Sequence, residues 1–298
     1  MKVSINVTNY SWPGGPARLG ASLRDLAARA DAAGVDTLWL SDHLIQADPT
    51  AAPGQTEMLE AYTALGFVAA RTERVRLGTM VTAVTFRAPA LLVKAVTTLD
   101  VLSGGRAWLG VGAGYHGEEA EAMGLSLPPV AERFERLQET LELAERMWAG
   151  DETPFEGRHY QLARPHGSPP PLTRPHPPIL IGGTGAKRTL RLVAEHADAC
   201  NVFDIPDGGK AVRQSLDVLA RHCDDVGRPF SAIEKTLSTR LGADDTSDGF
   251  ARRAEASAAL GIDHLIVVTP GAWSLERLET LAAAIPAISQ ITPDSDRS

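Results

Sequence analysis

One stretch of the sequence, residues 74–124, limits the possible folds more than any other. Residues 75–84 form an apolar run with the length of a buried strand, and residues 89–103 have helical spacing that ends at a glycine pair. A second apolar run, residues 107–111, then opens into a glycine-rich turn. A strand, a helix and another strand in this order indicate two parallel strands joined by a right-handed crossover.

The alternation of strand and helix continues along the whole chain. It predicts an α/β fold, a (β/α)8 TIM barrel that forms a single domain over residues 1–298, with an open doubly wound sheet as the alternative. Strands are expected at residues 3–7, 37–40, 75–84, 107–111, 178–181, 199–203, 232–241 and 264–268. Helices are expected at residues 22–33, 57–71, 89–102, 131–149, 186–196, 208–226, 248–260 and 274–284.

One segment interrupts this alternation after the fourth expected helix. Residues 151–177 contain seven prolines and a short hairpin-like piece, FEGRHYQL. Long irregular segments in compact domains are usually functional or mobile. We therefore expect an insertion that covers the mouth of the barrel; a disordered surface excursion is the alternative.

Composition and charge exclude several classes of protein. The formal net charge of −8 leaves no basic patch for nucleic acid, and the longest apolar runs have only the length of strands, so no membrane span is predicted. The N-terminus lacks the long apolar region of a signal peptide. Two cysteines, Cys200 and Cys223, fit a reduced cytoplasmic protein. A small molecule is therefore the expected partner.

Polar residues follow two of the expected strands directly. Asp42 and His43 come after residues 37–40, and Tyr115 follows residues 107–111. The carboxyl ends of parallel strands meet at the edge where ligands bind. A carboxylate beside an imidazole can transfer protons near neutral pH, which makes this pair a candidate site. A capping aspartate and a packing histidine are the alternative.

A glycine-rich turn, Gly182-Gly183-Thr184-Gly185, follows another expected strand and is expected to open a helix. Free N–H groups and the helix dipole would favour a phosphate there, and a plain left-handed turn is the alternative. Lys187 and Arg188 would fall in the first helical turn, which is unfavourable for cations unless an anion is bound. No histidine or cysteine set has metal-ligand spacing, so no metal site is predicted.

Together these pieces resemble the bacterial luciferase-like family, in the branch that uses the deazaflavin coenzyme F420. The resemblance covers about two thirds of the chain in family order, at residues 41–43, 77–106, 109–124, 132–148 and 177–203. It implies an oxidoreductase that transfers a hydride between coenzyme F420 and a small organic substrate. The alternatives are an FMN-dependent monooxygenase, a non-catalytic deazaflavin carrier and a flavin-free barrel isomerase or aldolase. The resemblance is also compatible with a homodimer.

The resemblance also implies roles for individual residues. His43 would lie near the reacting face of the cofactor, with Tyr115 as its partner in proton handling, and Glu119 would organise the site. A bulge in the third strand, with a cis peptide between Met80 and Val81, would lie behind the ring. The expected cofactor-binding residues are Asp42, Met80, Val81, Thr82, Ala113, Gly114, Gly182, Gly183, Thr184 and Gly185.

Two departures from the family pattern concern the substrate. The deazaflavin-dependent glucose-6-phosphate dehydrogenases carry a catalytic glutamate where this chain has Tyr115, and a tryptophan where it has Ala47. Both differences argue against oxidation of a sugar phosphate. They leave His43 and Tyr115 as the expected catalytic pair.

Overall fold

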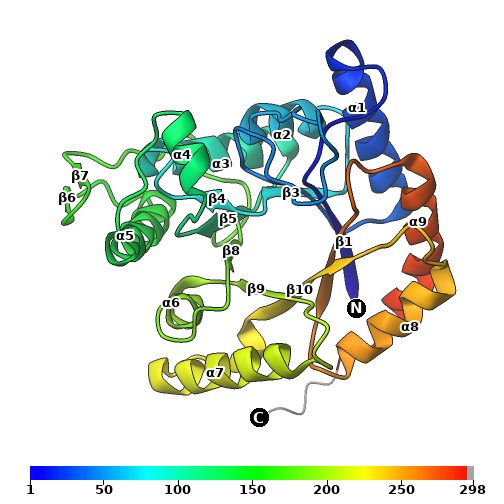
Figure 1. The fold of residues 1–298 in the computed structure, drawn as a ribbon. Coiled ribbons are helices and arrows are strands. Elements are labelled where there is room, and N and C mark those ends of the chain that lie inside the picture. The colour runs from blue at the N-terminus through cyan, green and yellow to red at the C-terminus, as the bar shows by residue number, and fades with distance from the viewer. Residues whose placement is uncertain (294–298) are drawn as a thin grey trace.

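The computed structural model describes residues 1–293 and contains a parallel barrel surrounded by helices (Figure 1). The sheet order is β3-β2-β1-β11-β10-β9-β8-β5-β4. The two ends of this order are both parts of the third expected strand, so the sheet closes on itself. The (β/α)8 prediction is confirmed. The strands are β1 (Lys2–Val7), β2 (Thr37–Leu40), β3 (Arg76–Thr79), β4 (Thr82–Ala83), β5 (Leu109–Gly112), β8 (Ile179–Gly182), β9 (Ala199–Phe203), β10 (Glu234–Arg240) and β11 (His264–Val268).

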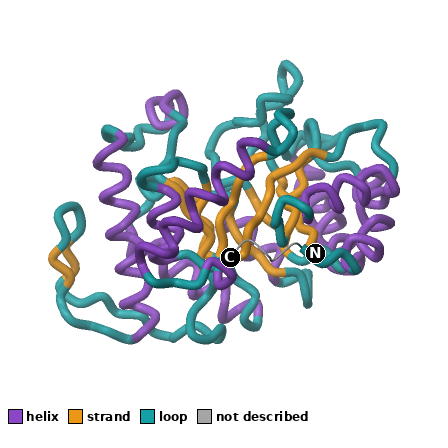
Figure 2. The backbone as a smooth tube through the Cα atoms, turned by 90° about the horizontal axis from the view of Figure 1, so that it is seen from below, coloured by secondary structure: helices purple, strands orange, loops and turns teal. Residues whose placement is uncertain are grey.

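Helices cover the outside of the barrel, as the view from below shows (Figure 2). None of those within residues 1–293 is both long and apolar enough to cross a membrane. The helices are α1 (Pro16–Ala33), α2 (Ala61–Ala69), α3 (Pro89–Ser103), α4 (Gly117–Ala122), α5 (Val130–Ala149), α6 (Thr189–His196), α7 (Lys210–Val226), α8 (Ser247–Ala258) and α9 (Leu275–Ser289), with a short 3-10 turn at Phe230–Ala232.

The third strand is broken where the family resemblance places a bulge. Instead of one strand over residues 75–84, β3 ends at Thr79 and β4 begins at Thr82. The peptide bond between Met80 and Val81 is cis, which confirms that prediction. The Thr79 hydroxyl donates to the Gly110 carbonyl of β5 at 2.9 Å and lies 3.0 Å from the Thr82 hydroxyl. These bonds hold the two halves of the strand in place below the break.

Two tryptophans fill the middle of the barrel. The rings of Trp39 and Trp108 lie 5.5 Å apart between centroids, and both side chains are buried. Gly78 makes room for them, since a Cβ there would lie 2.6 Å from the Trp39 ring and 2.8 Å from the Trp108 Cβ. Gly110 instead allows the close approach of β3, because a Cβ there would lie 1.9 Å from the Thr79 carbonyl oxygen. This packing closes the barrel below Met80 and Val81.

A polar network occupies the end of the barrel where the strands begin. Ser4 and His264 are bonded at 2.5 Å through Nε2, and His264 Nδ1 contacts Glu234 at 2.5 Å. Burial opposes ionisation of Glu234, yet its hydrogen bond to His264, the charge of His264 and the nearby Lys2 lower its pKa to about 2. This end of the molecule is therefore held together by buried ionic and hydrogen-bonded contacts.

Two expectations about the fold are wrong. Helix α6 begins at Thr189, so Lys187 and Arg188 precede it rather than lie in its first turn. The insertion does not cover the mouth: none of residues 151–177 lines the cavity there, and the Leu172 and Thr173 N–H groups bond instead to Asp100 of α3. Its hairpin, β6 (Phe155–Glu156) and β7 (Gln161–Leu162), packs outside α5, where Glu139 accepts N–H bonds from residues 158–160.

Candidate active site

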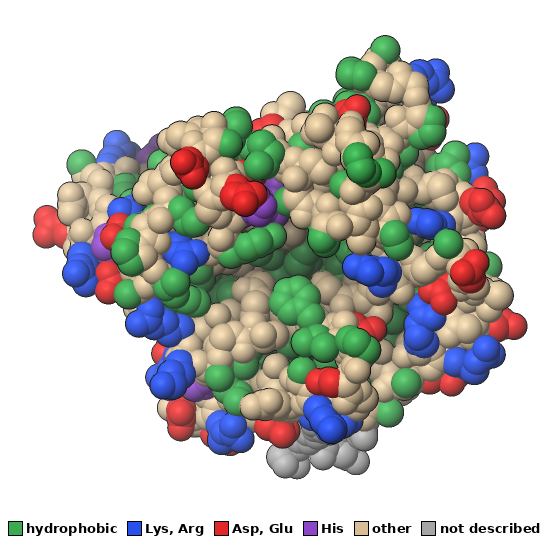
Figure 3. All heavy atoms as spheres, in the orientation of Figure 1, with side chains coloured by type: hydrophobic (Ala, Val, Ile, Leu, Met, Phe, Trp, Pro, Cys, Tyr) green, Lys and Arg blue, Asp and Glu red, His purple; other side chains and the backbone are tan. Residues whose placement is uncertain are grey.

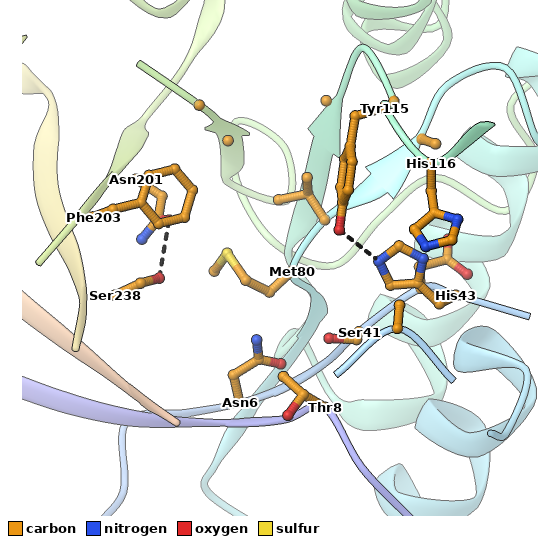
Figure 4. A pocket seen from close by; sticks show the side chains of 18 of the residues that line it. Asn6, Thr8, Ser41, His43, Met80, Tyr115, His116, Asn201, Phe203 and Ser238 are labelled. Carbon is orange, nitrogen blue, oxygen red and sulfur yellow. Dashed lines mark hydrogen bonds between the residues drawn. The ribbon is translucent and has the colours of Figure 1, made fainter. Parts of the chain in front are cut away.

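A cavity of about 950 Å³ opens at the end of the barrel where the strands finish. In the space-filling view it is a hollow edged by hydrophobic side chains (Figure 3). Each of the eight barrel strands contributes residues to the cavity wall at or just after its end. Figure 4 shows several of these side chains pointing into the cavity. Going along the chain, the wall includes Asn6, His43, Met80, Ala113, Gly182, Asn201, Ser238 and Thr269.

His43 is held by a buried carboxylate on the short helix α4. Its Nδ1 lies 2.7 Å from Glu119 Oε2, and the other Glu119 oxygen accepts the Leu44 N–H. Glu119 is fully buried, whereas the His43 side chain keeps 19% exposure to the cavity. The helix that carries Glu119 is capped by His116, whose Nδ1 accepts the Glu119 N–H at 3.1 Å. The sequence analysis did not predict this helix.

Tyr115 completes the group on the cavity side of His43. Its hydroxyl lies 3.4 Å from His43 Nε2, and the two rings meet edge to face with centroids 5.9 Å apart. Partial desolvation and the charge of Glu119 raise the pKa of Tyr115, so the phenol keeps its proton at neutral pH. Tyr115 is nevertheless 73% exposed, because it lies on the rim of the cavity.

Asp42, in the cavity wall, is engaged in an ion pair with Arg87. Its carboxylate contacts both terminal nitrogens of Arg87 and accepts a hydrogen bond from Thr82 at 2.6 Å. Arg87 also contacts Glu60 at 2.6 Å and lies over the Tyr62 ring. Burial opposes the Arg87 charge, but the bonds and charge of Asp42 outweigh it and raise the pKa of Arg87. The pair fixes the backbone that leads directly to His43.

The glycine-rich turn reaches the cavity with its first two residues. A Cβ on Gly182 would lie 3.0 Å from the Val81 side chain, and Gly183 has a φ of +111°, which favours glycine. Arg133 of α5 faces the same region, since its Nη1 contacts the Gly114 carbonyl after β5, the strand that pairs with β8. Within residues 1–293, Arg133 Nε is buried without a hydrogen-bond partner. An anion bound in this corner would meet the backbone of Gly182 and Gly183 and the positive charge of Arg133.

Most of the expected site residues meet at the cavity. Those that line it are Asp42, His43, Met80, Val81, Ala113, Gly114, Tyr115, Gly182 and Gly183. Thr82 does not, because it is buried and turned toward Asp42 and Tyr62. Thr184 and Gly185 are exposed and lie outside the wall.

Several lining residues were missed. Asn6 is only 5% exposed, its Oδ1 has no partner within residues 1–293, and its amide points into the cavity (Figure 4). Arg133 and Phe203 were missed as well. Asn6 lies near the end of β1 and Phe203 at the end of β9, so their position at the ligand-binding edge was a signal for both.

The chain matches the model of a known protein family over almost its whole length. The family described as luciferase-like monooxygenase matches residues 1–288. The chain belongs to the luciferase-like monooxygenase family. Within it, the chain is 39% identical over 232 residues to an F420-dependent glucose-6-phosphate dehydrogenase from Amycolatopsis mediterranei (strain U-32). That match covers 74% of this chain and 65% of the relative, slightly less than two thirds of its length.

Solved structures share the fold of this luciferase-like chain. An F420-dependent secondary alcohol dehydrogenase, in complex with an F420–acetone adduct, aligns with a TM-score of 0.80 at 17% identity, covering 97% of this chain and 99% of the other. A monooxygenase from Streptomyces bottropensis, RslO1, aligns with a TM-score of 0.69 at 23% identity, covering 96% and 80%. At these identities the likeness supports the fold alone.

Proposed function

We propose that the protein is an F420-dependent oxidoreductase that transfers a hydride between the deazaflavin and a small organic substrate. The observation that carries this proposal is His43, backed by a buried glutamate and open to a cavity formed by all eight strand ends. The 39% identity to an F420-dependent dehydrogenase supports the choice of cofactor.

The cavity fits an aromatic cofactor with an anionic side chain. Met80 and Val81 offer a flat apolar wall for a ring, and Gly182, Gly183 and Arg133 would hold a phosphate. The Asn6 side-chain amide, which faces the cavity, could bond a polar edge of the ring. When bound, the deazaflavin supplies the hydride chemistry at its C5.

The protein's part of the reaction is to move a proton at His43 Nε2. One Glu119 oxygen accepts the Leu44 N–H, and a carboxylate can only accept from the ring, so we assign the histidine proton to Nδ1 and leave Nε2 as an acceptor. Nε2 then takes the hydroxyl proton of an alcohol as its hydride leaves, or returns it to a carbonyl oxygen in the reverse direction. The charge of Glu119 stabilises the protonated ring, and the Tyr115 hydroxyl orients the substrate oxygen.

Titration of the protein with coenzyme F420 and, separately, with FMN tests the cofactor. We expect quenching of deazaflavin fluorescence on binding and a lower dissociation constant for F420 than for FMN. Equal or tighter binding of FMN would favour a flavin monooxygenase instead. Tight F420 binding without turnover of any donor or acceptor would favour a non-catalytic carrier.

A further inference from the structure

The charged residues on the cavity wall show which substrates it could accept. Four carboxylates line it, Asp42, Asp48, Glu119 and Asp204, against two cations, Arg133 and Arg240. Asp42 is neutralised by Arg87, and Glu119 is fully buried against His43, so two acids, Asp48 and Asp204, remain against the two bases. A dianionic substrate would therefore meet repulsion as well as attraction.

Neither cation is well placed to bind a substrate anion. Arg133 contacts the Gly114 carbonyl in the corner proposed for the cofactor phosphate. Arg240, at the end of β10, is exposed, and the Thr239 hydroxyl beside it donates to the Asp204 carboxylate at 2.7 Å. The negative charge of Asp204 on the same wall offsets the attraction of this region for an anion.

The mouth of the cavity carries apolar side chains instead. Tyr115, Val130 and Phe203 line it and are 73%, 53% and 49% exposed. Figure 4 places Phe203 across the cavity from Tyr115 and His43, with Met80 between them. Large exposed apolar side chains grouped around a hollow indicate an apolar ligand.

We propose that the substrate is an uncharged alcohol or ketone with an apolar body, and that Phe203 is the residue that selects this body. This inference rests on the proposed function. In the oxidising direction the carbinol C–H bond breaks and its hydride, with both electrons, passes to the deazaflavin. The hydroxyl proton passes to His43 Nε2 and the C=O bond forms; reduction is the reverse.

Binding to the complex of the protein with oxidised F420 tests the substrate class, with the deazaflavin spectrum as readout. The neutral series is 2-butanone to 2-octanone, and 5-oxohexanoate is the anionic match to 2-hexanone. We expect the dissociation constant to fall about fourfold per added methylene until the cavity is full. We expect 5-oxohexanoate to bind at least tenfold more weakly than 2-hexanone, and glucose 6-phosphate to leave the spectrum unchanged.

A pair of variants assigns the selection to Phe203. Phe203→Ala should weaken 2-heptanone binding at least fivefold and flatten the dependence on chain length. Ile205→Ala is the matched control, because Ile205 is also 49% exposed but lies outside the cavity wall. It should change ketone affinity less than twofold, and both variants should keep F420 affinity.

Three results would overturn this inference while leaving the proposed function intact. They are binding of 5-oxohexanoate or glucose 6-phosphate at least as tight as that of 2-hexanone, affinity independent of chain length, and no response to any compound. Each presupposes that F420 binds, which the titration establishes first. Failure of F420 itself to bind would instead remove the proposed function, and this inference with it.

Discussion

Two histidines at opposite ends of the barrel make the same pair of contacts in different surroundings. His43 Nδ1 contacts Glu119 at 2.7 Å and its Nε2 lies 3.4 Å from the Tyr115 hydroxyl. His264 Nδ1 contacts Glu234 at 2.5 Å and its Nε2 contacts the Ser4 hydroxyl at 2.5 Å. Side chains of serine, histidine and glutamate in this order are the components of a hydrolytic triad.

Burial distinguishes the two groups. Ser4 is fully buried and His264 is 1% exposed, so no substrate can reach them. The Ser4 hydroxyl also accepts the Thr37 N–H at 2.9 Å, which ties it into the sheet. His43 instead faces a cavity at the end of the barrel where such folds carry their chemistry. Triad-like distances therefore indicate a site only where a cavity accompanies them.

Substitution of each histidine should separate the roles of the two groups most clearly. His43→Ala should lower kcat by between tenfold and about 10⁴-fold, because positioned acid–base groups contribute that much. Cofactor affinity should stay within a few-fold, and the melting temperature should fall because the buried Glu119 carboxylate loses a partner. His264→Gln, at the other end, should be about 1–3 kcal/mol less stable with turnover per folded molecule within twofold. Full turnover by folded His43→Ala would leave Tyr115 as the proton-handling residue.

The two carboxylates should differ in the same way. Glu119→Gln should lower kcat at least tenfold, because an amide N–H turned toward Nδ1 would move the histidine proton to Nε2. F420 affinity, measured by fluorescence, should remain within threefold. Glu118→Gln is the control: it removes the same charge one residue away on α4, from an exposed side chain outside the cavity wall. Equal losses in both variants would contradict the proposed role of Glu119.

Cofactor binding should depend on a glycine at the cavity and not on one at the far end. Gly183→Asp adds a carboxylate and a side chain where the phosphate is expected, and should weaken F420 binding at least tenfold, about 1.4 kcal/mol. Gly34→Asp, at the end of α1, is the control, because it adds the same charge at another glycine with positive φ that lies far from the cavity. Unchanged affinity in the first variant, or a similar loss in the second, would place the phosphate elsewhere.

The smallest effect concerns stability at low pH. Glu234 has a pKa of about 2, below its ordinary value of 4.5. The stability it contributes should therefore be complete above about pH 4.5 and decline as the pH falls toward 2. Denaturant unfolding of the wild type and of Glu234→Gln should show a gap that is constant from pH 7 to 5 and narrows below 4.5. A gap that is constant at every pH would mean that the Glu234 charge is not involved.

The alternation of apolar runs and helical spacing was enough to predict the barrel, because each βα unit leaves its own local pattern. The break in the third strand came only from the family resemblance, since residues 75–84 read as one apolar run. Helix α4 was missed because its six residues are too few for a periodic signal. The insertion was misplaced because a helix that runs back along a parallel barrel finishes at the end where the strands begin, away from the mouth.

The candidate site was predictable where residues follow strand ends directly, as His43 and Tyr115 do. The partners of these residues were harder to find. Arg87 pairs with Asp42 from 45 positions away and Arg133 reaches Gly114 from α5, and such contacts depend on how helices pack around the barrel. Thr82 alternates in the strand pattern like a lining residue, but the break turns its hydroxyl toward Asp42.

A crystal structure of the protein with oxidised coenzyme F420 tests the central claim most directly. We expect the ring to lie against Met80 and Val81, the phosphate at Gly182 and Gly183 beside Arg133, and the C5 face open toward His43 Nε2. A ring bound with His43 behind it, or a phosphate remote from Gly183, would contradict the account of this site.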